Sequence, residues 1–225
     1  MHTVATVNAD TKQRIMTKEY INVIGAGLAG CEAAYQAAQM GVNVTLYEMK
    51  PSKYTPAHHS PKFAELVCSN SLRSNELSNA IGVLKEELRA LGSLIMESAY
   101  STRVAAGSAL AVDRELFSDY ITDKIKNHPN IEIVYEEVKE INPDEITVIA
   151  SGPLTSDPLA DHIREALGLG NLHFFDAAAP IIDFESIDMT KAFFFFFYNK
   201  GDADYINCPM NEEEYKAFYS ALVSA

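Results

Sequence analysis

A glycine-rich turn near the start of the chain limits its possible folds more than any other feature. Residues 20–30 read YINVIGAGLAG, an apolar stretch followed by Gly25, Gly27 and Gly30 in the pattern G-x-G-x-x-G. In such a strand-turn-helix unit, the first glycine allows a sharp turn, the second admits a pyrophosphate, and the third lets helix and strand pack closely. The helix start presents free N–H groups and the positive end of its dipole to the phosphates.

The sequence after the turn supports the same interpretation. Residues 42–47 predict a second buried strand, and Glu48 follows it at a spacing where an acid binds a ribose hydroxyl in dinucleotide folds. We therefore predict a dinucleotide site made by Gly25, Ala26, Gly27, Leu28, Ala29, Gly30 and Glu48. The alternative is an ordinary βαβ unit with a tight turn, in which Glu48 is a plain acid at the end of a strand.

Composition limits the class of protein. Of the 225 residues, 48% are hydrophobic and 22% are charged, which is typical of a globular protein. No run of 18 apolar residues exists, so we expect no membrane span, and the polar residues 1–18 predict a disordered extension rather than a secretory signal. The cysteines lie far apart without a C-x-x-C pair, which favours a reducing compartment and argues against a disulfide framework or a metal site.

The charge balance argues against a general nucleic-acid binder. The chain has 18 basic and 31 acidic residues, a net charge of −13, whereas phosphate contacts need local positive charge. The best local candidate is the segment 50–73, which holds six basic residues and one acid, Glu65. Those basic residues are Lys50, Lys53, His58, His59, Lys62 and Arg73. Charge alone favours the alternative, a solvated loop with ordinary lysines, and Arg73 is either a phosphate contact or surface charge.

Helices and strands alternate along the following stretch. The expected helices cover residues 28–40, 81–91, 93–100, 114–126 and 158–167. The expected strands cover residues 131–135, 138–141 and, as a buried strand, 145–150, and residues 109–112 form a short apolar piece. Asp113 is a good N-cap for its helix, in which Leu116, Phe117, Tyr120 and Ile121 form the expected core face. Leu84, Leu88 and Leu91 share one face of the second helix.

These elements predict an α/β protein with two parts. A Rossmann-like dinucleotide fold occupies residues 19–160, and part of a second α+β domain occupies residues 161–225 and begins with strands at 174–184. Phe193–Phe197 predicts a strand that must be buried on both faces, because an exposed one would be an aggregation hazard. Asn211 and Glu214 predict a capping box for a last helix.

Several segments resemble one family closely, the folate- and FAD-dependent tRNA (uracil-5-)-methyltransferases of the TrmFO type. The matching segments are GAGLAGCEAA, AELVCSNSLRS, SGPLTSDPLA, DAAAPI and KGDADYINCPM. They cover most of residues 20–225. The second and the last are more specific than the glycine turn, because generic flavoproteins lack them. The resemblance implies that the dinucleotide fold binds FAD.

The resemblance also implies an activity and its partners. A bacterial cytoplasmic enzyme of this family transfers a methylene from methylenetetrahydrofolate, reduces it with electrons from NAD(P)H through FAD, and methylates C5 of a T-loop uridine in tRNA. The family's two functional cysteines match Cys68 and Cys208, and a thiolate that adds at C6 of uracil makes C5 nucleophilic. The sequence does not assign the two roles. As an alternative, a lone cysteine is often a small buried hydrophobe, as we expect for Cys31.

Two departures from the family keep other readings open. Phe193–Phe197 replaces a more varied segment that includes a serine-arginine pair, and family members are about twice as long, so that only the first half of the dinucleotide fold is expected here. We expect a truncated chain, a fragment or a split gene product. The competing interpretations are a non-catalytic flavin-binding remnant, a subunit that needs a second polypeptide, and a generic FAD oxidoreductase.

Overall fold

A computed structural model describes residues 20–168, 182–197 and 200–224 of the chain. The predicted extension at 1–18 and most of the stretch expected to form strands at 174–184 lie outside the described residues. Within the described part of the chain, no helix is both long and apolar enough to cross a bilayer.

A parallel sheet forms the centre of the first part. Its four strands are β1 (Tyr20–Ile24), β2 (Asn43–Tyr47), β6 (Ile131–Val134) and β7 (Thr147–Ile149). They lie in the order β6-β2-β1-β7, so the chain first builds outward on one side of β1 and then crosses to the other side. In folds of this kind, ligands bind at the carboxyl ends of the strands where the order reverses. The sheet confirms the predicted α/β, Rossmann-like fold.

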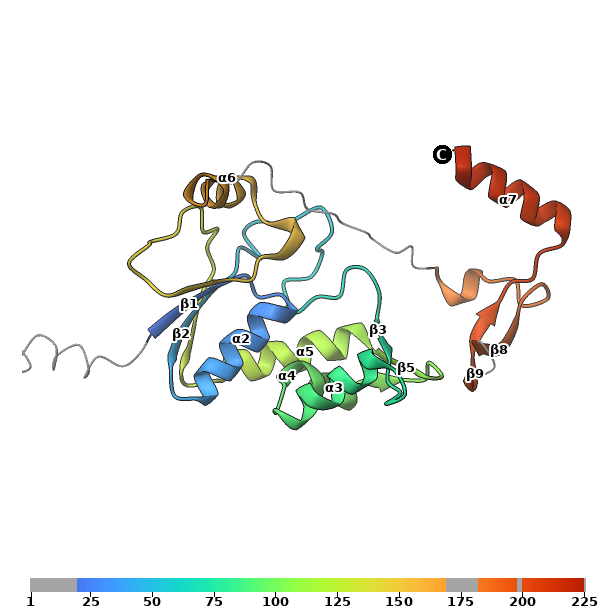
Figure 1. The fold of residues 1–225 in the computed structure, drawn as a ribbon, viewed down its shortest axis with the longest axis horizontal. Coiled ribbons are helices and arrows are strands. Elements are labelled where there is room, and N and C mark those ends of the chain that lie inside the picture. The colour runs from blue at the N-terminus through green and yellow to red at the C-terminus, as the bar shows by residue number, and fades with distance from the viewer. Residues whose placement is uncertain (1–19, 169–181, 198–199, 225) are drawn as a thin grey trace, which may run out of the picture.

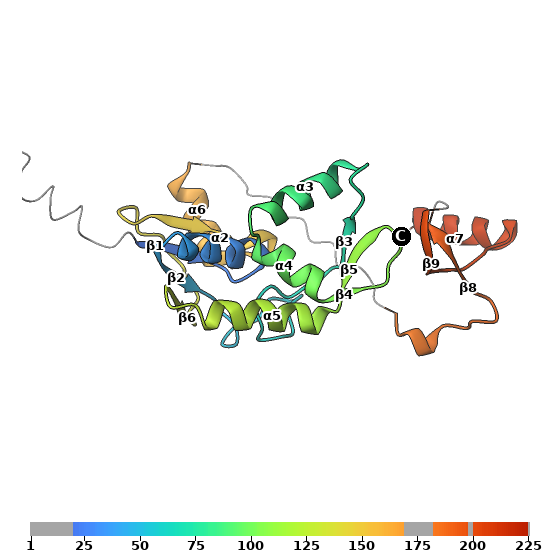
Figure 2. The ribbon, with the colours of Figure 1, turned by 90° about the horizontal axis from the view of Figure 1, so that it is seen from below.

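Helices cover one face of this sheet and form the core with it. The helices of this layer are α2 (Leu28–Gln39), α4 (Leu94–Ser101) and α5 (Arg114–Lys126). α2 packs on β1 and β2, α5 packs on β6, and α4 packs on both helices, as Figures 1 and 2 show. Ala34 and Ala38 are buried on α2, and these small side chains let the helix lie close to the strands.

A small antiparallel sheet extends the body away from the glycine turn. It contains β3 (Ser71–Ser74), β4 (Arg103–Val104) and β5 (Ala109–Val112) in the order β3-β5-β4. β5 is buried along its whole length, and α3 (Ala80–Ala90) packs beside β3. The sheet is relevant to the site because β3 forms the C-terminal end of the AELVCSNSLRS segment, which contains Cys68.

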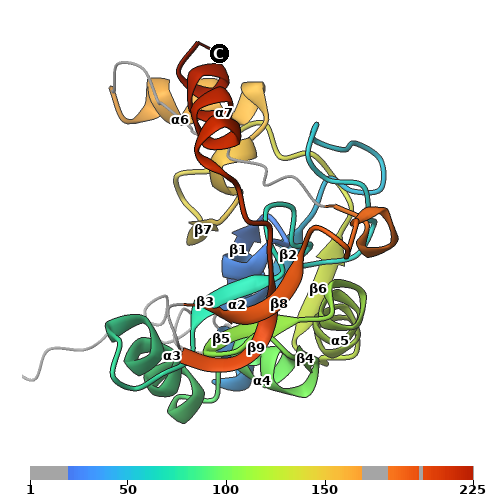
Figure 3. The same cartoon turned by 90° about the vertical axis from the view of Figure 1, so that its right-hand side faces the viewer.

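The remaining elements follow the parallel sheet in the sequence. They are the 3-10 helix Gly152–Leu154, α6 (Asp157–Ala166), the 3-10 helix Phe184–Ser186, β8 (Phe193–Phe197), β9 (Lys200–Asn207) and α7 (Glu212–Ser224). β8 and β9 form an antiparallel pair that, with α7, makes a separate lobe beyond β5 (Figure 1); Figure 3 views the molecule from the side of this lobe, with β8 and β9 in front of β3 and β5. Gly107 N donates to Asp204 Oδ2 (2.6 Å), and Tyr205 OH donates to Ala106 O (3.1 Å), which fastens β9 to the β4–β5 turn.

Several expected strands differ from the observed structure. The strand expected at 145–150 is shorter and is not buried, because β7 pairs with β1 alone and leaves Val148 37% and Ile149 44% exposed. Residues 138–141 form no strand. Phe184 lies in a 3-10 helix rather than in a strand.

Apolar helix faces and the phenylalanine run are also more exposed than expected. Leu84 on α3 and Leu91 at the C-cap of this helix face solvent, because the helix docks through Gly82, where an added Cβ would lie 2.0 Å from the Glu76 carbonyl oxygen. Leu116 on α5 is exposed as well, although Phe117 and Ile121 are fully buried as predicted. The side chains of Phe193 to Phe196 are 40–50% exposed, and the described aromatic residues of α7 are exposed too.

Candidate functional site

The glycine turn joins the carboxyl end of β1 to α2 in a strained, tightly packed path. Gly25 has a φ of +99°, and its N–H donates to Tyr47 O at 2.8 Å, which ties the turn to the end of β2. A Cβ at Gly25 would lie 2.9 Å from Ala150 O, and one at Gly30 would lie 1.7 Å from Gly25 O. The first and third glycines are therefore required by backbone conformation and close packing.

The second glycine has a different environment, and it fits a bound pyrophosphate. Gly27 is the N-cap of α2, no side chain caps the helix, and no acid lies in its first turn. A Cβ on Gly27 would have no neighbouring atom within 4 Å, so the space above this residue is open. The first N–H groups of a helix have no intrahelical acceptor, and those of Leu28, Ala29 and Gly30 are the ones at this end.

Glu48 stands at the end of β2 beside the same turn. Its Oε2 accepts a hydrogen bond from Ala26 N (3.1 Å), its Oε1 accepts one from Lys50 N (2.9 Å), and the residue is buried. Each carboxylate oxygen has two lone pairs, so both retain an acceptor position for a ribose hydroxyl. The arrangement fits the predicted role.

A pocket opens over these groups at the carboxyl ends of β1 and β2. Its walls are the turn at 24–27, the segments 47–50 and 136–138, and residues 150–151, 154–156 and 159, with Thr55, His58 and Glu65 from the loop that follows β2. Ala150 and Ser151, which directly follow β7, lie in this wall. The structure thus assembles the predicted turn, Glu48 and the strand-end segment around one cavity.

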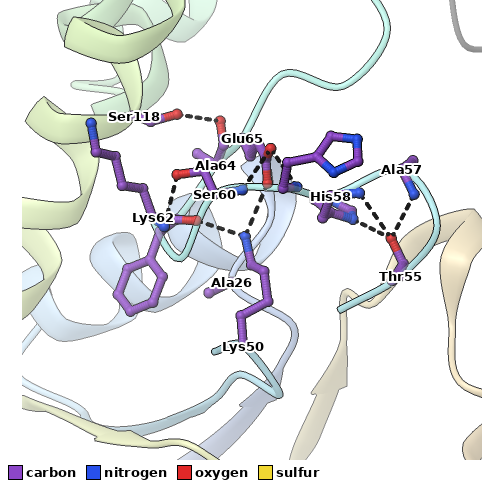
Figure 4. A network of polar contacts seen from close by, with 12 residues as sticks. Ala26, Lys50, Thr55, Ala57, His58, Ser60, Lys62, Ala64, Glu65 and Ser118 are labelled. Carbon is purple, nitrogen blue, oxygen red and sulfur yellow. Dashed lines mark hydrogen bonds and ion pairs between the residues drawn. The ribbon is translucent and has the colours of Figure 1, made fainter. Parts of the chain in front are cut away.

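A hydrogen-bond network that includes residues of the pocket wall was missed by the sequence analysis (Figure 4). Ala64 N donates to Ala26 O (2.8 Å), and Lys50 Nζ donates to Lys62 O (2.7 Å) and lies 3.5 Å from Glu65 Oε2. The sequence signal for this network was Glu65, which is the only acid in the basic segment 50–73.

The basic segment is not a free cationic patch. Lys53 pairs with Glu137 at 2.6 Å, and Lys62 pairs with Glu115 and Asp119, each at 2.8 Å. Hydrogen bonds from Lys62 to its two carboxylates raise the pKa of its ammonium group. Arg73 is exposed on β3 and has a φ of +68°.

The three cysteines have distinct environments. Cys31 is fully buried, its thiol donates to Ala26 O (3.3 Å), and burial raises the pKa of the thiol, so it is a packing residue as expected. Cys68 and Cys208 are exposed. Neither lines the pocket at the glycine turn. Cys68 precedes β3, whereas Cys208 follows β9 in the separate lobe.

Comparisons with known proteins agree with this fold. A TrmFO methylenetetrahydrofolate--tRNA-(uracil-5-)-methyltransferase from Geotalea uraniireducens is 63% identical over 211 residues, 93% of this chain and 48% of the relative. The protein of the same name from Acetivibrio thermocellus is 60% identical over 207 residues, 92% of this chain and 48% of the relative. The chain therefore spans about half the length of these curated relatives.

A solved structure and a family model complete the comparison. The crystal structure of Aquifex aeolicus GidA superimposes with a TM-score of 0.52 and 18% identity, covering 67% of this chain and 31% of that one, which supports the fold alone. The family model for GIDA, glucose inhibited division protein A, matches residues 20–225. Because that match covers most of the sequence, the chain belongs to the GIDA family.

Proposed function

We propose that this chain binds FAD and acts in the methylation of C5 of the T-loop uridine of tRNA, with methylenetetrahydrofolate as the one-carbon donor and NAD(P)H as the reductant. The observation that carries the proposal is the identity of about 60% to proteins named for the folate-dependent reaction, over more than 90% of this chain. The reaction takes place in the cytoplasm, where tRNA and reduced nicotinamide meet.

The pocket supports the cofactor part of the proposal. Gly27 leaves room for the pyrophosphate above the start of α2, and Glu48 has acceptors for the ribose of the adenosine half. When bound, FAD supplies the electron transfer that reduces the methylene to a methyl group. The residues of this chain bind the cofactor and orient it at the carboxyl edge of the sheet.

Cys68 and Cys208 supply the proposed thiol chemistry. One thiolate forms a bond to C6 of uracil, and the C5–C6 electron pair moves toward the C4 carbonyl, so that C5 becomes nucleophilic. After C5 has bonded to the one-carbon unit, a base removes the C5 proton and the electron pair expels the thiolate from C6. The exposure of both thiols supports these roles over that of the buried Cys31.

Thiol variants test this proposal directly. Cys68→Ala and Cys208→Ser should each abolish methyl transfer to tRNA while FAD binding changes little, and Cys31→Ala is the matched control that keeps the reaction. Turnover retained in either exposed-thiol variant would remove that residue from the mechanism. If the purified wild-type chain shows no flavin absorbance after FAD is added, the cofactor proposal fails.

A second candidate is a flavin-binding subunit that works with another polypeptide. The exposed side chains of Phe193 to Phe196 and the exposed aromatic residues of α7 favour it, because large apolar surfaces of this kind usually contact a partner. The test is to add the separately produced part of the Acetivibrio thermocellus relative that this chain does not match. A methylation rate that stays unchanged would argue against the subunit hypothesis.

A further inference from the structure

We propose that Glu65 positions Cys68 and, through Lys50, couples this thiol to the state of the dinucleotide pocket. The inference rests on the proposed function, because it takes the pocket to bind FAD and Cys68 to take part in the reaction. Glu65 is a positioning residue here.

Glu65 is held on both of its carboxylate oxygens. Oε1 accepts hydrogen bonds from His59 N (2.9 Å) and Ser60 N (3.0 Å), and Oε2 faces Lys50 Nζ at 3.5 Å. The Lys50 side chain is 5% exposed and that of Glu65 is 15% exposed. Removing one charge of such a desolvated pair leaves the other without full compensation, so the pair resists separation.

The same pair belongs to the wall of the pocket. Both residues line the cavity, and the backbone N–H of Lys50 donates to Glu48, whose other oxygen accepts from Ala26 N. Ala26 O in turn accepts from Ala64 N (2.8 Å), immediately before Glu65. The glycine turn, Glu48, Lys50 and residues 62–65 therefore form one hydrogen-bonded unit, part of which Figure 4 shows.

Cys68 lies between this unit and a second fixed point. Two hydrogen bonds of 3.0 Å connect Asn70 to β5. Asn70 Nδ2 donates to Val112 O, and Val112 N donates to the carbonyl oxygen of Asn70. Leu66 is buried, whereas Cys68 itself is exposed. Only Leu66 and Val67 lie between Glu65 and Cys68, so the attachment on the pocket side limits how far the thiol segment can move.

Ligand binding should therefore reach the thiol through the backbone. A dinucleotide that contacts the turn and Glu48 stabilises the hydrogen-bonded form of the unit, which restricts the motions of residues 66–69 that bring the exposed Cys68 thiol into position to react. Alkylation of Cys68 should then slow when FAD binds. Direct shielding by the flavin would give the same slowing, but that effect would not depend on the charge of Glu65.

The experiment compares alkylation of Cys68 by N-ethylmaleimide in the full chain with and without saturating FAD, read on the Cys68 peptide by mass spectrometry. For the wild type, we expect FAD to slow the reaction by about fivefold or more, the lower end of typical coupling between sites. Glu65→Gln keeps an oxygen for His59 N and Ser60 N but presents a neutral amide to Lys50. We expect this variant to bind FAD and to lose most of the slowing.

Two further variants complete the design. Glu115→Gln is the matched control, because Glu115 pairs with Lys62 on the surface at 2.8 Å, outside the pocket, and it should behave as wild type. If Glu65→Gln does not fold or does not bind FAD, Lys50→Gln breaks the same pair from the other side, while Glu65 keeps its two backbone donors.

The outcomes separate this inference from the proposed function. Full slowing in a folded, FAD-binding Glu65→Gln or Lys50→Gln variant overturns the inference and assigns the effect to direct shielding. FAD binding to the wild type without any change at Cys68 also overturns it and leaves the cofactor proposal intact. A wild-type chain that binds no FAD overturns both.

Discussion

Substitution of Gly27 by alanine should separate cofactor binding from folding. Gly27 has a φ of −75° and a ψ of −169°, which alanine adopts readily, and an added Cβ has no neighbour within 4 Å. Loss of backbone freedom in the unfolded chain stabilises the variant by about 0.4–1 kcal/mol. Alanine is a poorer N-cap than glycine by roughly 0.5–1 kcal/mol. These terms nearly cancel, so we expect a Tm shift smaller than about 4 °C for a chain of this length.

The effect on binding should be much larger. The new methyl group stands where the pyrophosphate approaches the backbone, so at least one charge-assisted hydrogen bond to an N–H group is lost or stretched. Such a bond contributes about 1.5–3 kcal/mol, which corresponds to a rise of about tenfold or more in the Kd for FAD. Flavin fluorescence titration gives the Kd, and thermal unfolding followed by circular dichroism gives Tm on the same sample.

Gly30→Ala is the contrasting variant. Its Cβ would lie 1.7 Å from Gly25 O, a backbone atom that cannot move without rebuilding the turn. Overpacking of this kind costs about 3 kcal/mol or more, so Tm should fall clearly. Wild-type FAD affinity in Gly27→Ala would refute the assignment of the turn as the phosphate site. A fall in Tm as large as that of Gly30→Ala would mean that lost binding reflects lost folding.

Three further predictions concern the scaffold. Asp113→Ala removes the side-chain acceptor of Leu116 N (3.0 Å) and should lower the free energy of unfolding by about 1 kcal/mol in urea titrations, whereas Asp113→Asn should keep most of it. Hydrogen bonds from Tyr120 and then Lys124 hold the pKa of Glu97 below its ordinary value. The contribution of Glu97 to stability is therefore present above the ordinary pKa and is lost as the pH falls through the lower pKa that this carboxyl has in the folded state. Glu97→Gln should therefore destabilise at pH 7, by less than about 1 kcal/mol because Glu97 is partly exposed, and have no effect in strong acid. Phe195→Glu should reduce self-association in light scattering, and unchanged scattering would show that the exposed phenylalanine strand does not drive it.

Local signals predicted much of the fold. The glycine turn, the strand before it and the acid after β2 follow from short patterns whose physical meaning does not depend on distant residues. The same holds for the cap at Asp113 and the capping box, in which Glu214 N donates to Asn211 Oδ1 (2.9 Å) and Asn211 N donates to Glu214 Oε2 (2.8 Å). In each of these caps, a side chain forms a hydrogen bond with a backbone N–H group only a few residues away.

Burial was harder to predict, because it depends on which face of an element docks. The leucines of α3 follow a helical period, yet Gly82 and Lys85 form the docked face, and Lys85 Nζ donates to Ser74 O (2.8 Å). This helix face docks through a glycine and through a lysine that donates to a backbone carbonyl. Neither residue adds to a hydrophobic pattern in the sequence. Similarly, the sequence of β7 resembles a buried strand, but its position at the sheet edge exposes it.

The basic segment shows why counting charges could not identify its role. Lys50, Lys53 and Lys62 belong to one stretch of sequence, but their acids come partly from distant positions, Glu137 and Glu115 among them. Each lysine already has a carboxylate within 3.5 Å, so a phosphate would have to displace that partner before it gained a cation. For the exposed pairs this exchange costs little, since such pairs contribute at most about 1 kcal/mol. For Lys50 it would open a desolvated pair in the pocket wall, which is why we assign this lysine to Glu65 rather than to RNA.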